Sequence, residues 1–365
     1  MNKLKVSPGV LDIAPYIPGR STAEGGKRLI KLSSNETPLG TSPLAMEAYK
    51  RLAGELHRYP DGGSYELRDA LAARYGLEAE RIICGNGSDE LIGLMAMAYA
   101  GPGDEVLFTE HAFAIYKIAA QANSATPVEV PEAGLTADVD ALLDRAGPDT
   151  RLCFLANPNN PTGTYIPADE VRRLRAGLPE HTLLVLDSAY AEYLRREDYN
   201  DGVELVDNHD NVVTTRTFSK IYGLSALRLG WMYAPRTVID VINRIRAPFN
   251  VNAAAQAAGV AALQDTDFID RAIAFNEEWM PRLERELGAL GLTVHPSSAN
   301  FVLVEFPDRP EQGAEKAYEY LLARGIIPRR LDNYGLPKCL RFSLGLEDEN
   351  QEVVAAVKAF LESAA

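Results

Sequence analysis

Short apolar runs alternate with helix-like patterns along residues 64–234 of the chain. The runs are rich in leucine and β-branched residues, which is typical of strands that are buried on both faces of a sheet. Because such strands alternate with helices, the pattern predicts an α/β layer in which helices flank a mostly parallel central sheet. The expected strands are residues 81–84, 105–109, 126–130, 151–156, 182–187, 212–217 and 229–234.

The helix with the most local signals is expected at residues 64–76. Ser64 is suited to the N-cap, Glu66 puts a carboxylate in the first turn, and Gly76 is suited to end the helix. Leu67 stands where a full capping box has Glu or Gln, so only part of the start signal is present.

The pattern changes after about Pro235, where longer helices are followed by a few strands. Such a mixture predicts a smaller α+β domain. The helices and strands expected there are residues 268–290, 299–306, 315–325, 326–330 and 339–345. The predicted parts of the chain are an N-terminal segment packed on the small domain (1–40), a large domain (41–245) and a small domain (246–365).

Length and composition restrict the class of protein. A chain of 365 residues fits two domains, and its net charge of −14 argues against a nucleic-acid partner, because phosphate binding needs a basic face. The three cysteines are far apart, which favours reduced thiols in a cytoplasmic enzyme. The apolar stretches are too short for a signal peptide or a membrane span, and the five histidines lack metal-ligand spacing. We therefore expect no membrane and no metal.

Polar side chains follow several of the expected strands, at the edge of a parallel sheet where ligands bind. After the first strand, Gly85 and Gly87 allow close backbone approach, and Ser88 with the amides beyond it is suited to hold a phosphate. A plain helix cap is the alternative for this run. After the fourth strand, Asn160 lies in a proline-stiffened turn, which suits a fixed hydrogen-bond donor.

Asp187 and Lys220 stand at or just beyond the ends of two further strands. A carboxylate at the end of a buried strand is unfavourable unless it meets a cation or hydrogen bonds. A lysine in apolar surroundings tends to lose its proton, and a neutral amine is a nucleophile towards carbonyls. An aspartate and a lysine are the groups that pyridoxal phosphate needs, and Ser219 and Arg228 suit its phosphate. Helix capping by the aspartate and a lysine that reaches solvent are the alternatives.

Three motifs stand in a fixed order, namely NPNNPTG, then DSAY, then SKIYGLSALRLG. They place Asn160, Asp187, Lys220 and Arg228 at spacings that resemble those of the fold-type I PLP-dependent aminotransferases, although DSAY replaces the commoner DEAY. APYIPG, SSNETPLG, HRYPDGGSYELRDALA, CGNGSDELI and YGLPKCLRFSLG are similar to motifs of the histidinol-phosphate aminotransferase branch. The resemblance spans nearly the whole chain and implies an aspartate-aminotransferase-like fold.

The resemblance implies a role for each residue of a cofactor site. Lys220 would bond covalently to pyridoxal 5′-phosphate and would move the proton at the substrate Cα. Asp187 would pair with the ring nitrogen, while Asn160 and Tyr190 would bond the ring 3′-oxygen. Phe113 would stack on the ring, where many relatives have tyrosine. The residues expected around the phosphate are Gly87, Ser88, Asp89, Ser219 and Arg228.

The resemblance also implies contacts with the substrate and with a second subunit. Arg341 would clamp the anionic group of the substrate, which is a carboxylate or the phosphate of histidinol phosphate. Asn35 would face the substrate and Tyr16 would be a lid tyrosine, with a turn residue and a packing aromatic as the alternatives. Tyr59 would reach the cofactor phosphate across the interface of a homodimer.

The expected reaction is transamination between L-histidinol phosphate and 2-oxoglutarate, which gives imidazole acetol phosphate and L-glutamate in histidine biosynthesis. An aminotransferase for phenylalanine and tyrosine is the alternative, because HAFAIY replaces the P-x-Y-x-x-Y pattern of narrower members. A decarboxylase on the same fold is less favoured; reaction type depends on which Cα bond stands perpendicular to the ring. Arg329 or Arg330 is suited to supply a further cation for a substrate phosphate.

Overall fold

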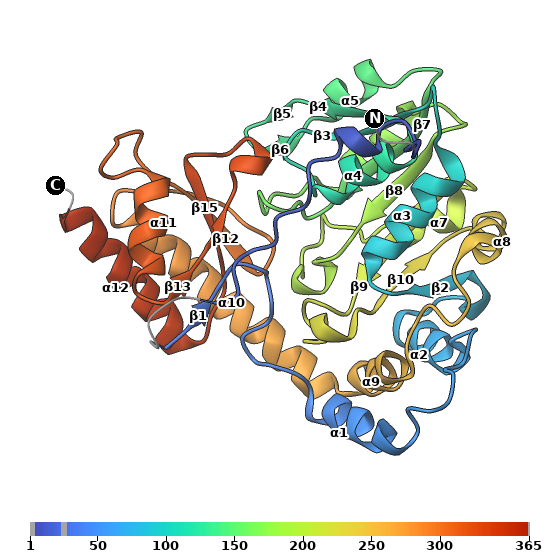
Figure 1. Cartoon of the computed structure of the whole chain (residues 1–365), viewed down its shortest axis with the longest axis horizontal. Helices are drawn as coiled ribbons and strands as arrows, with labels where there is room; N and C mark the ends of the chain where they lie inside the picture. The colour runs from blue at the N-terminus through green and yellow to red at the C-terminus, as the bar shows by residue number, and fades with distance from the viewer. Residues whose placement is uncertain (1–3, 23–27, 364–365) are drawn as a thin grey trace.

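A seven-stranded sheet forms the centre of the large domain in the computed structural model, which describes residues 4–22 and 28–363 (Figure 1). The strand order is β2-β10-β9-β8-β7-β3-β4, and β10 runs antiparallel to both of its neighbours while the other pairs are parallel. The prediction of a mostly parallel sheet in an α/β layer is confirmed. The strands are β2 (Ile82–Gly85), β3 (Glu105–Thr109), β4 (Thr126–Val130), β7 (Thr150–Ala156), β8 (Leu183–Asp187), β9 (Val212–Thr217) and β10 (Gly230–Tyr233).

Helices cover both faces of this sheet, which is why most of its strand residues are buried (Figure 1). Side chains alternate along β7, so Leu152 and Phe154 pack with α3, α4 and α8, whereas Cys153 and Leu155 pack in the cluster with α2, α5, α6, α7 and α9. The helices of this domain are α1 (Pro43–Arg51), α2 (Tyr65–Tyr75), α3 (Ser88–Tyr99), α4 (Ile115–Ala122), α5 (Val139–Arg145), α6 (Ala168–Gly177), α7 (Val203–Asn208), α8 (Arg236–Ile245) and α9 (Ala253–Gln264).

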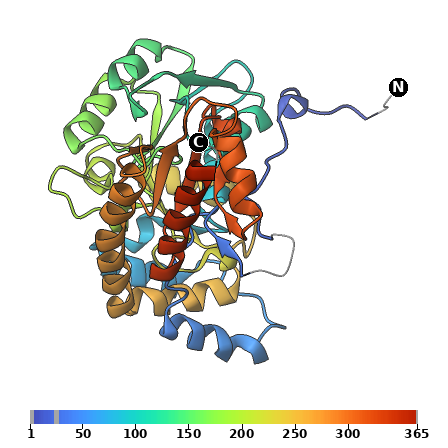
Figure 2. The ribbon, with the colours of Figure 1, turned by 90° about the vertical axis from the view of Figure 1, so that its left-hand side faces the viewer.

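The C-terminal part folds around a second sheet with the strand order β11-β12-β15-β14. Figure 2 shows its three helices, α10, α11 and α12, side by side on the outer face. Trp279, Val302, Phe342 and Phe360 belong to its separate hydrophobic core. The elements are α10 (Thr266–Gly288), β11 (Thr293–His295), β12 (Phe301–Glu305), α11 (Ala314–Leu322), β14 (Arg329–Arg330), β15 (Cys339–Ser343) and α12 (Glu347–Ser363).

The N-terminal segment is attached to this second core by a short strand. Strand β1 (Ile30–Lys31) pairs in parallel with β13 (Ile326–Ile327), and the side chain of Ile30 is buried in the core of the small domain. The single strand expected at residues 326–330 is therefore wrong. Pro328, which cannot donate a ladder hydrogen bond, separates β13 from β14, and these two strands join different sheets.

The domain boundary near residue 245 stays a prediction. Ala255 and Ala258 of α9 pack in the same hydrophobic core as the strands of the large sheet, although both follow that boundary in the sequence. The long helix α10 begins at the large core with Ile269 and ends in the small one with Leu287. We therefore propose that the two domains meet within α10.

Helix α2 begins and ends as expected, but its cap is a different residue. Ser64 occupies the N-cap position with a left-handed φ of 49°, and its hydroxyl makes no capping hydrogen bond. The carboxylate of Asp61 accepts the backbone N–H of Tyr65 at 2.7 Å and that of Gly63 at 2.9 Å. Ser64 thus stands at the predicted N-cap position, but Asp61 makes the hydrogen bonds that a capping side chain would make. Gly76 ends the helix with a φ of 69°, as expected.

The remaining short elements lie in connections. Strands β5 (Glu132–Ala133) and β6 (Thr136–Ala137) form a small hairpin after β4. Of the helices in the described ranges, none has the length and apolar character needed to cross a membrane. The 3-10 turns are Val10–Asp12, Leu52–Gly54, Ala79–Arg81, Ala191–Tyr193, Ser225–Leu227 and Asp332–Tyr334.

Candidate active site

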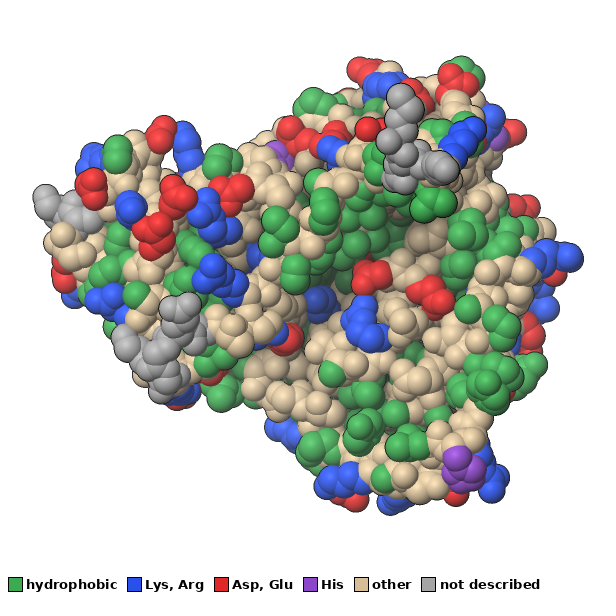
Figure 3. All heavy atoms as spheres, in the orientation of Figure 1, with side chains coloured by type: hydrophobic (Ala, Val, Ile, Leu, Met, Phe, Trp, Pro, Cys, Tyr) green, Lys and Arg blue, Asp and Glu red, His purple; other side chains and the backbone are tan. Residues whose placement is uncertain are grey.

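A cavity of about 240 Å³ opens at the carboxyl ends of the parallel strands, next to the small domain. Figure 3 shows the hollow between the two lobes, with basic and acidic side chains at its floor. Because parallel strands end at one edge of the sheet, residues distant in sequence meet there. Nine of the expected site residues line the cavity, namely Ser88, Asp89, Phe113, Asn160, Asp187, Tyr190, Ser219, Lys220 and Arg228.

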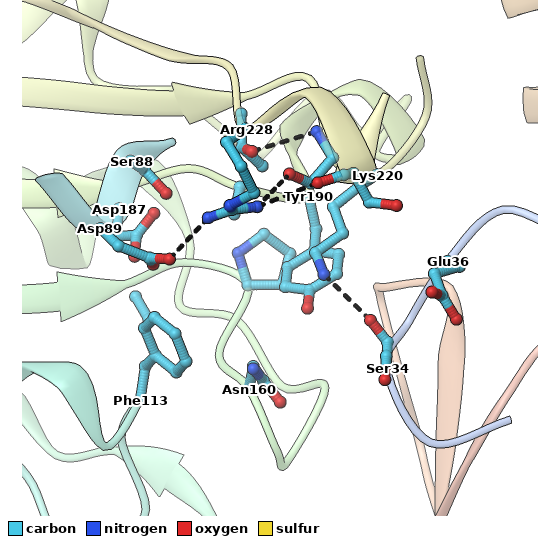
Figure 4. Close-up of a pocket in the computed structure, with 16 residues that line it drawn as sticks. Ser34, Glu36, Ser88, Asp89, Phe113, Asn160, Asp187, Tyr190, Lys220 and Arg228 are labelled. Carbon is cyan, nitrogen blue, oxygen red and sulfur yellow. Dashed lines mark hydrogen bonds and ion pairs between the residues drawn. The ribbon is translucent and has the colours of Figure 1, made fainter. Parts of the chain in front are cut away.

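Lys220 follows β9 and points its amine into the middle of the cavity (Figure 4). Its Nζ donates a hydrogen bond of 3.3 Å to the carbonyl of Ser34, and it lies 5.7 Å from the ring centre of Tyr190. Burial, followed by the positive charge of Arg341, lowers the pKa of Lys220 to about 8. About one tenth of this lysine is therefore neutral at pH 7 and able to act as a nucleophile, far more than for a lysine with an ordinary pKa.

Asp187 is the last residue of β8 and is only 5% exposed. Its carboxylate accepts hydrogen bonds from the hydroxyl of Tyr116 at 2.7 Å and from that of Thr215 at 3.2 Å. Burial raises the pKa of Asp187 to about 6, and these two hydrogen bonds oppose the rise. The site therefore holds a desolvated carboxylate that would gain from a cationic partner in the cavity.

A cradle for an anion lies at the start of α3. The helix begins at Ser88 without a side-chain cap, so its first amides are free of intrahelical partners. Gly87 has a φ of 84°, and a Cβ there would come within 2.6 Å of Nη2 of Arg228. Arg228 contacts Asp89 at 2.8 Å and the hydroxyl of Ser219 at 3.4 Å. The arrangement fits a phosphate group.

Arg341 and Asn35 lie behind the residues that line the cavity. Arg341 on β15 donates to the side-chain oxygen of Asn160, and at 2.8 Å to the carbonyl of Ser33. Asn35 donates at 2.8 Å to the hydroxyl of Tyr190. Both residues are buried, and each contacts a residue that lines the cavity.

The two candidate cations of β14 differ sharply. Arg329 is 7% exposed, donates to the carbonyl of Ile17 at 2.8 Å and lies 5.8 Å from the ring centre of Tyr16. Arg330 is paired with Asp332 and Glu315 on the surface. The structure therefore brings Tyr16 together with Arg329, whereas the guanidinium of Arg330 is taken up by surface carboxylates.

Tyr59 lies outside the cavity of its own chain. It is 82% exposed and stacks on Phe249, with the ring centres 4.7 Å apart. Phe113, by contrast, lies at the cavity wall beside Asn160, and its ring meets that of Tyr116 edge-on at 6.0 Å (Figure 4).

Sequence reasoning missed several residues that line the cavity or support it. Ser34, Glu36, Thr217 and Ser225 line it, and Tyr116 supports Asp187 from below. Tyr116 is the last residue of the HAFAIY motif, and its place in that motif was a usable signal. Within the described ranges, no group of three or more His, Cys, Asp or Glu side chains is arranged to hold a metal ion.

Comparison with known proteins places this geometry in a family. The model of the aminotransferases of class I and II matches residues 27–357. The histidinol-phosphate aminotransferase of Paramagnetospirillum magneticum is 56% identical over 354 residues, which cover 97% of this chain and 98% of that protein.

Solved structures agree with this placement. The histidinol-phosphate aminotransferase of Sinorhizobium meliloti, in complex with pyridoxal-5′-phosphate, is 29% identical with a TM-score of 0.86, over 93% of this chain and 92% of that one. A Thermus thermophilus aspartate aminotransferase mutant shares the fold at 24% identity and a TM-score of 0.80, over 92% of each chain. The chain therefore belongs to the class I and II aminotransferases and, within them, to the histidinol-phosphate aminotransferases.

Proposed function

We propose that this protein transfers the amino group of L-histidinol phosphate to 2-oxoglutarate, with pyridoxal 5′-phosphate as cofactor. The observation that carries the proposal is the meeting of Lys220, Asp187 and Arg228 in one cavity, in a chain so similar to histidinol-phosphate aminotransferases. When bound, pyridoxal phosphate supplies an aldehyde that reacts with amines and a ring that withdraws electrons from the substrate Cα.

The residues of the cavity suit this cofactor group by group. The amides at the start of α3, with Ser219 and Arg228, would hold its phosphate. Asp187 would face the ring nitrogen and keep it protonated, and the bonds from Tyr116 and Thr215 hold the carboxylate ready for that contact.

Lys220 has two tasks in this proposal. As a neutral amine it would bond to the cofactor, and once released it would accept the proton from the substrate Cα. Its pKa of about 8 suits both tasks, because burial disfavours the ammonium form. The carbonyl of Ser34 orients Nζ in the cavity.

Asn160 and Tyr190 are proposed to bond the ring 3′-oxygen. Each is fixed from behind, Asn160 by Arg341 and Tyr190 by Asn35. Burial raises the pKa of Tyr190 to about 12, so the phenol keeps its proton and can donate it in a hydrogen bond.

The substrate end carries two cations for an anionic substrate. Arg341 is proposed to contact the phosphate of histidinol phosphate or the carboxylate of the 2-oxo acid, and Arg329, beside Tyr16, to add a second charge. Burial lowers the pKa of Arg341, and this desolvation would strengthen its attraction for an anion.

A homodimer is proposed, with Tyr59 reaching the partner's cofactor phosphate. Further exposed hydrophobic side chains lie in the segments on either side of Tyr59 in the sequence, and Figure 3 shows hydrophobic surface along the lower edge of the molecule, where Figure 1 places α1 and α2. They belong to α1, α2 and the loop between them, namely Leu44, Met46, Tyr49, Leu56 and Tyr65, and the exposed Phe249 stacks on Tyr59 itself. A cytoplasmic location stays a prediction, which the three buried, unpaired cysteines support.

The test is a panel of amino donors with 2-oxoglutarate, compared by kcat/KM. We expect histidinol phosphate to exceed tyrosine and phenylalanine. A preference for the aromatic donors would favour the alternative aminotransferase, and release of carbon dioxide without consumption of the 2-oxo acid would establish a decarboxylase.

A further inference from the structure

The connection between β3 and α4 carries Phe113 into the cavity and is anchored by His111. Nδ1 of His111 lies 3.2 Å from Oε2 of Glu132, at the start of β5. The Glu132 side chain is 1% exposed, and neither of its carboxylate oxygens has a hydrogen-bond partner among the described residues. A buried carboxylate is costly without a cation, so the pairing with His111 compensates this charge.

The backbone of His111 reaches a second loop of the site. Its carbonyl accepts a hydrogen bond of 3.2 Å from Nδ2 of Asn159, the residue before Asn160. On the same connection, the side chain of Glu110 accepts the backbone N–H of Glu132 at 3.0 Å. The ion pair therefore lies where the β3–α4 connection, the β4–β5 turn and the Asn160 loop meet.

We propose that His111 is a positioning residue, whose ion pair with Glu132 fixes the β3–α4 connection and so holds Phe113 against the cofactor ring. The proposal rests on the proposed function, because it assumes pyridoxal phosphate in the cavity. It also gives a physical role to the HAFAIY motif: His111 stands where the P-x-Y-x-x-Y pattern has proline, so an ion pair replaces a covalently restricted backbone angle.

Three carboxylates face His111, from three places in the fold. They are Glu132 on β5, Glu110 on the same connection and Glu129 on β4. The close contact with Glu132 raises the pKa of His111 above its usual 6.5, and burial opposes this. The pKa of His111 is therefore higher in the folded protein than in the unfolded chain. The ion pair is fully formed below about pH 6.5, and it is lost as the pH rises through the pKa of the folded protein.

The experiment measures the Kd of pyridoxal phosphate for the full-length protein stripped of cofactor, by absorbance titration between pH 6 and 9. His111→Gln removes the charge and should weaken binding about tenfold at pH 6.5, because the contact between opposite charges that fixes the connection is lost. It should also remove part of the pH dependence. The matched control is His295→Gln, because His295 pairs with Glu305 at 3.6 Å in the small domain, and its Kd should match the parent's.

The double variant His111→Gln/Glu132→Gln separates positioning from a buried-charge defect. It leaves no unpaired carboxylate, so it should fold and bind more tightly than His111→Gln alone, with clearly non-additive effects. Parental affinity and pH dependence in His111→Gln, or an equal loss in His295→Gln, would overturn the proposal. If the parent protein itself binds no pyridoxal phosphate, the proposed function fails as well. The measurement on the parent therefore distinguishes failure of the proposed function from failure of the positioning role alone.

Discussion

The hydroxyl of Tyr116 donates a 2.7 Å hydrogen bond to the buried carboxylate of Asp187. The tyrosine is itself held by stacking on Phe154, with ring centres 4.6 Å apart and planes within 4° of parallel. Helix α4 thereby fixes the acid at the end of β8. The orientation of the Asp187 carboxylate, which is proposed to face the cofactor nitrogen, thus depends on a helix beside the cavity.

Tyr116→Phe should keep the stacking and lose the hydrogen bond. Since that bond favours the ionised acid, the pKa of Asp187 should rise further above about 6, and kcat/KM at pH 7 should fall roughly tenfold or more. The measurement is kcat/KM against pH, in which the acid limb should move to higher pH. Tyr165→Phe is the matched control, because Tyr165 bonds Asp198 away from the cavity. Equal profiles for both variants would contradict the role.

Asp187→Asn should make the cofactor-free protein more stable at high pH. The pKa of Asp187 rises from 3.8 to about 6 on folding, so folded protein binds more protons between these values and stability falls as pH rises through them. The variant does not undergo this decrease in the free energy of unfolding, which amounts to about 3 kcal/mol at most in the parent. Urea unfolding at pH 4.5 and 8 should show a difference in the free energy of unfolding between variant and parent that grows with pH. The same difference at both pH values would argue against the raised pKa of Asp187.

Gly87→Ala should weaken cofactor binding on the order of tenfold or more through the phosphate cradle. The new Cβ would collide with Arg228 and displace it from the anion site, while the positive φ adds backbone strain. Gly103→Ala separates the two effects, because Gly103 has a φ of 93° and open space around its Cβ position. Titration with pyridoxal phosphate should show a loss only for Gly87→Ala. A similar loss in both variants would point to general strain.

Arg329→Gln should raise KM for histidinol phosphate about tenfold or more and change KM for tyrosine less. The reason is that a buried guanidinium beside Arg341 adds positive charge where a substrate phosphate would lie. Arg330→Gln serves as the control, since Arg330 pairs with surface carboxylates. Equal changes for both donors would show that Arg329 only holds the N-terminal segment.

The sequence predicted the large sheet well because most of its strands are buried on both faces and are rich in leucine and β-branched residues. It also predicted which strand ends carry Asp187 and Lys220, since a polar side chain after such a strand is conspicuous. The cap of α2 was missed because the carboxylate of Asp61 reaches over three residues, which a positional rule for Ser64 does not include.

Other features depend on tertiary contacts that no local pattern encodes. The division of residues 326–330 between two sheets is set by β1, from the opposite end of the chain. The support of Asp187 by Tyr116 joins residues 71 positions apart. The expected role of Tyr59 depends on a second subunit. Its side chain is exposed in a single chain, as a residue that contacts a partner would be.

Chemical trapping of the lysine tests the central claim most directly. The purified protein would be loaded with pyridoxal phosphate, reduced with borohydride to fix any lysine–cofactor bond, digested and analysed by peptide mass. We predict that the reduced cofactor mass is found on Lys220 and that Lys220→Ala takes up none. A cofactor mass on another lysine, or on no peptide at all, would contradict the account.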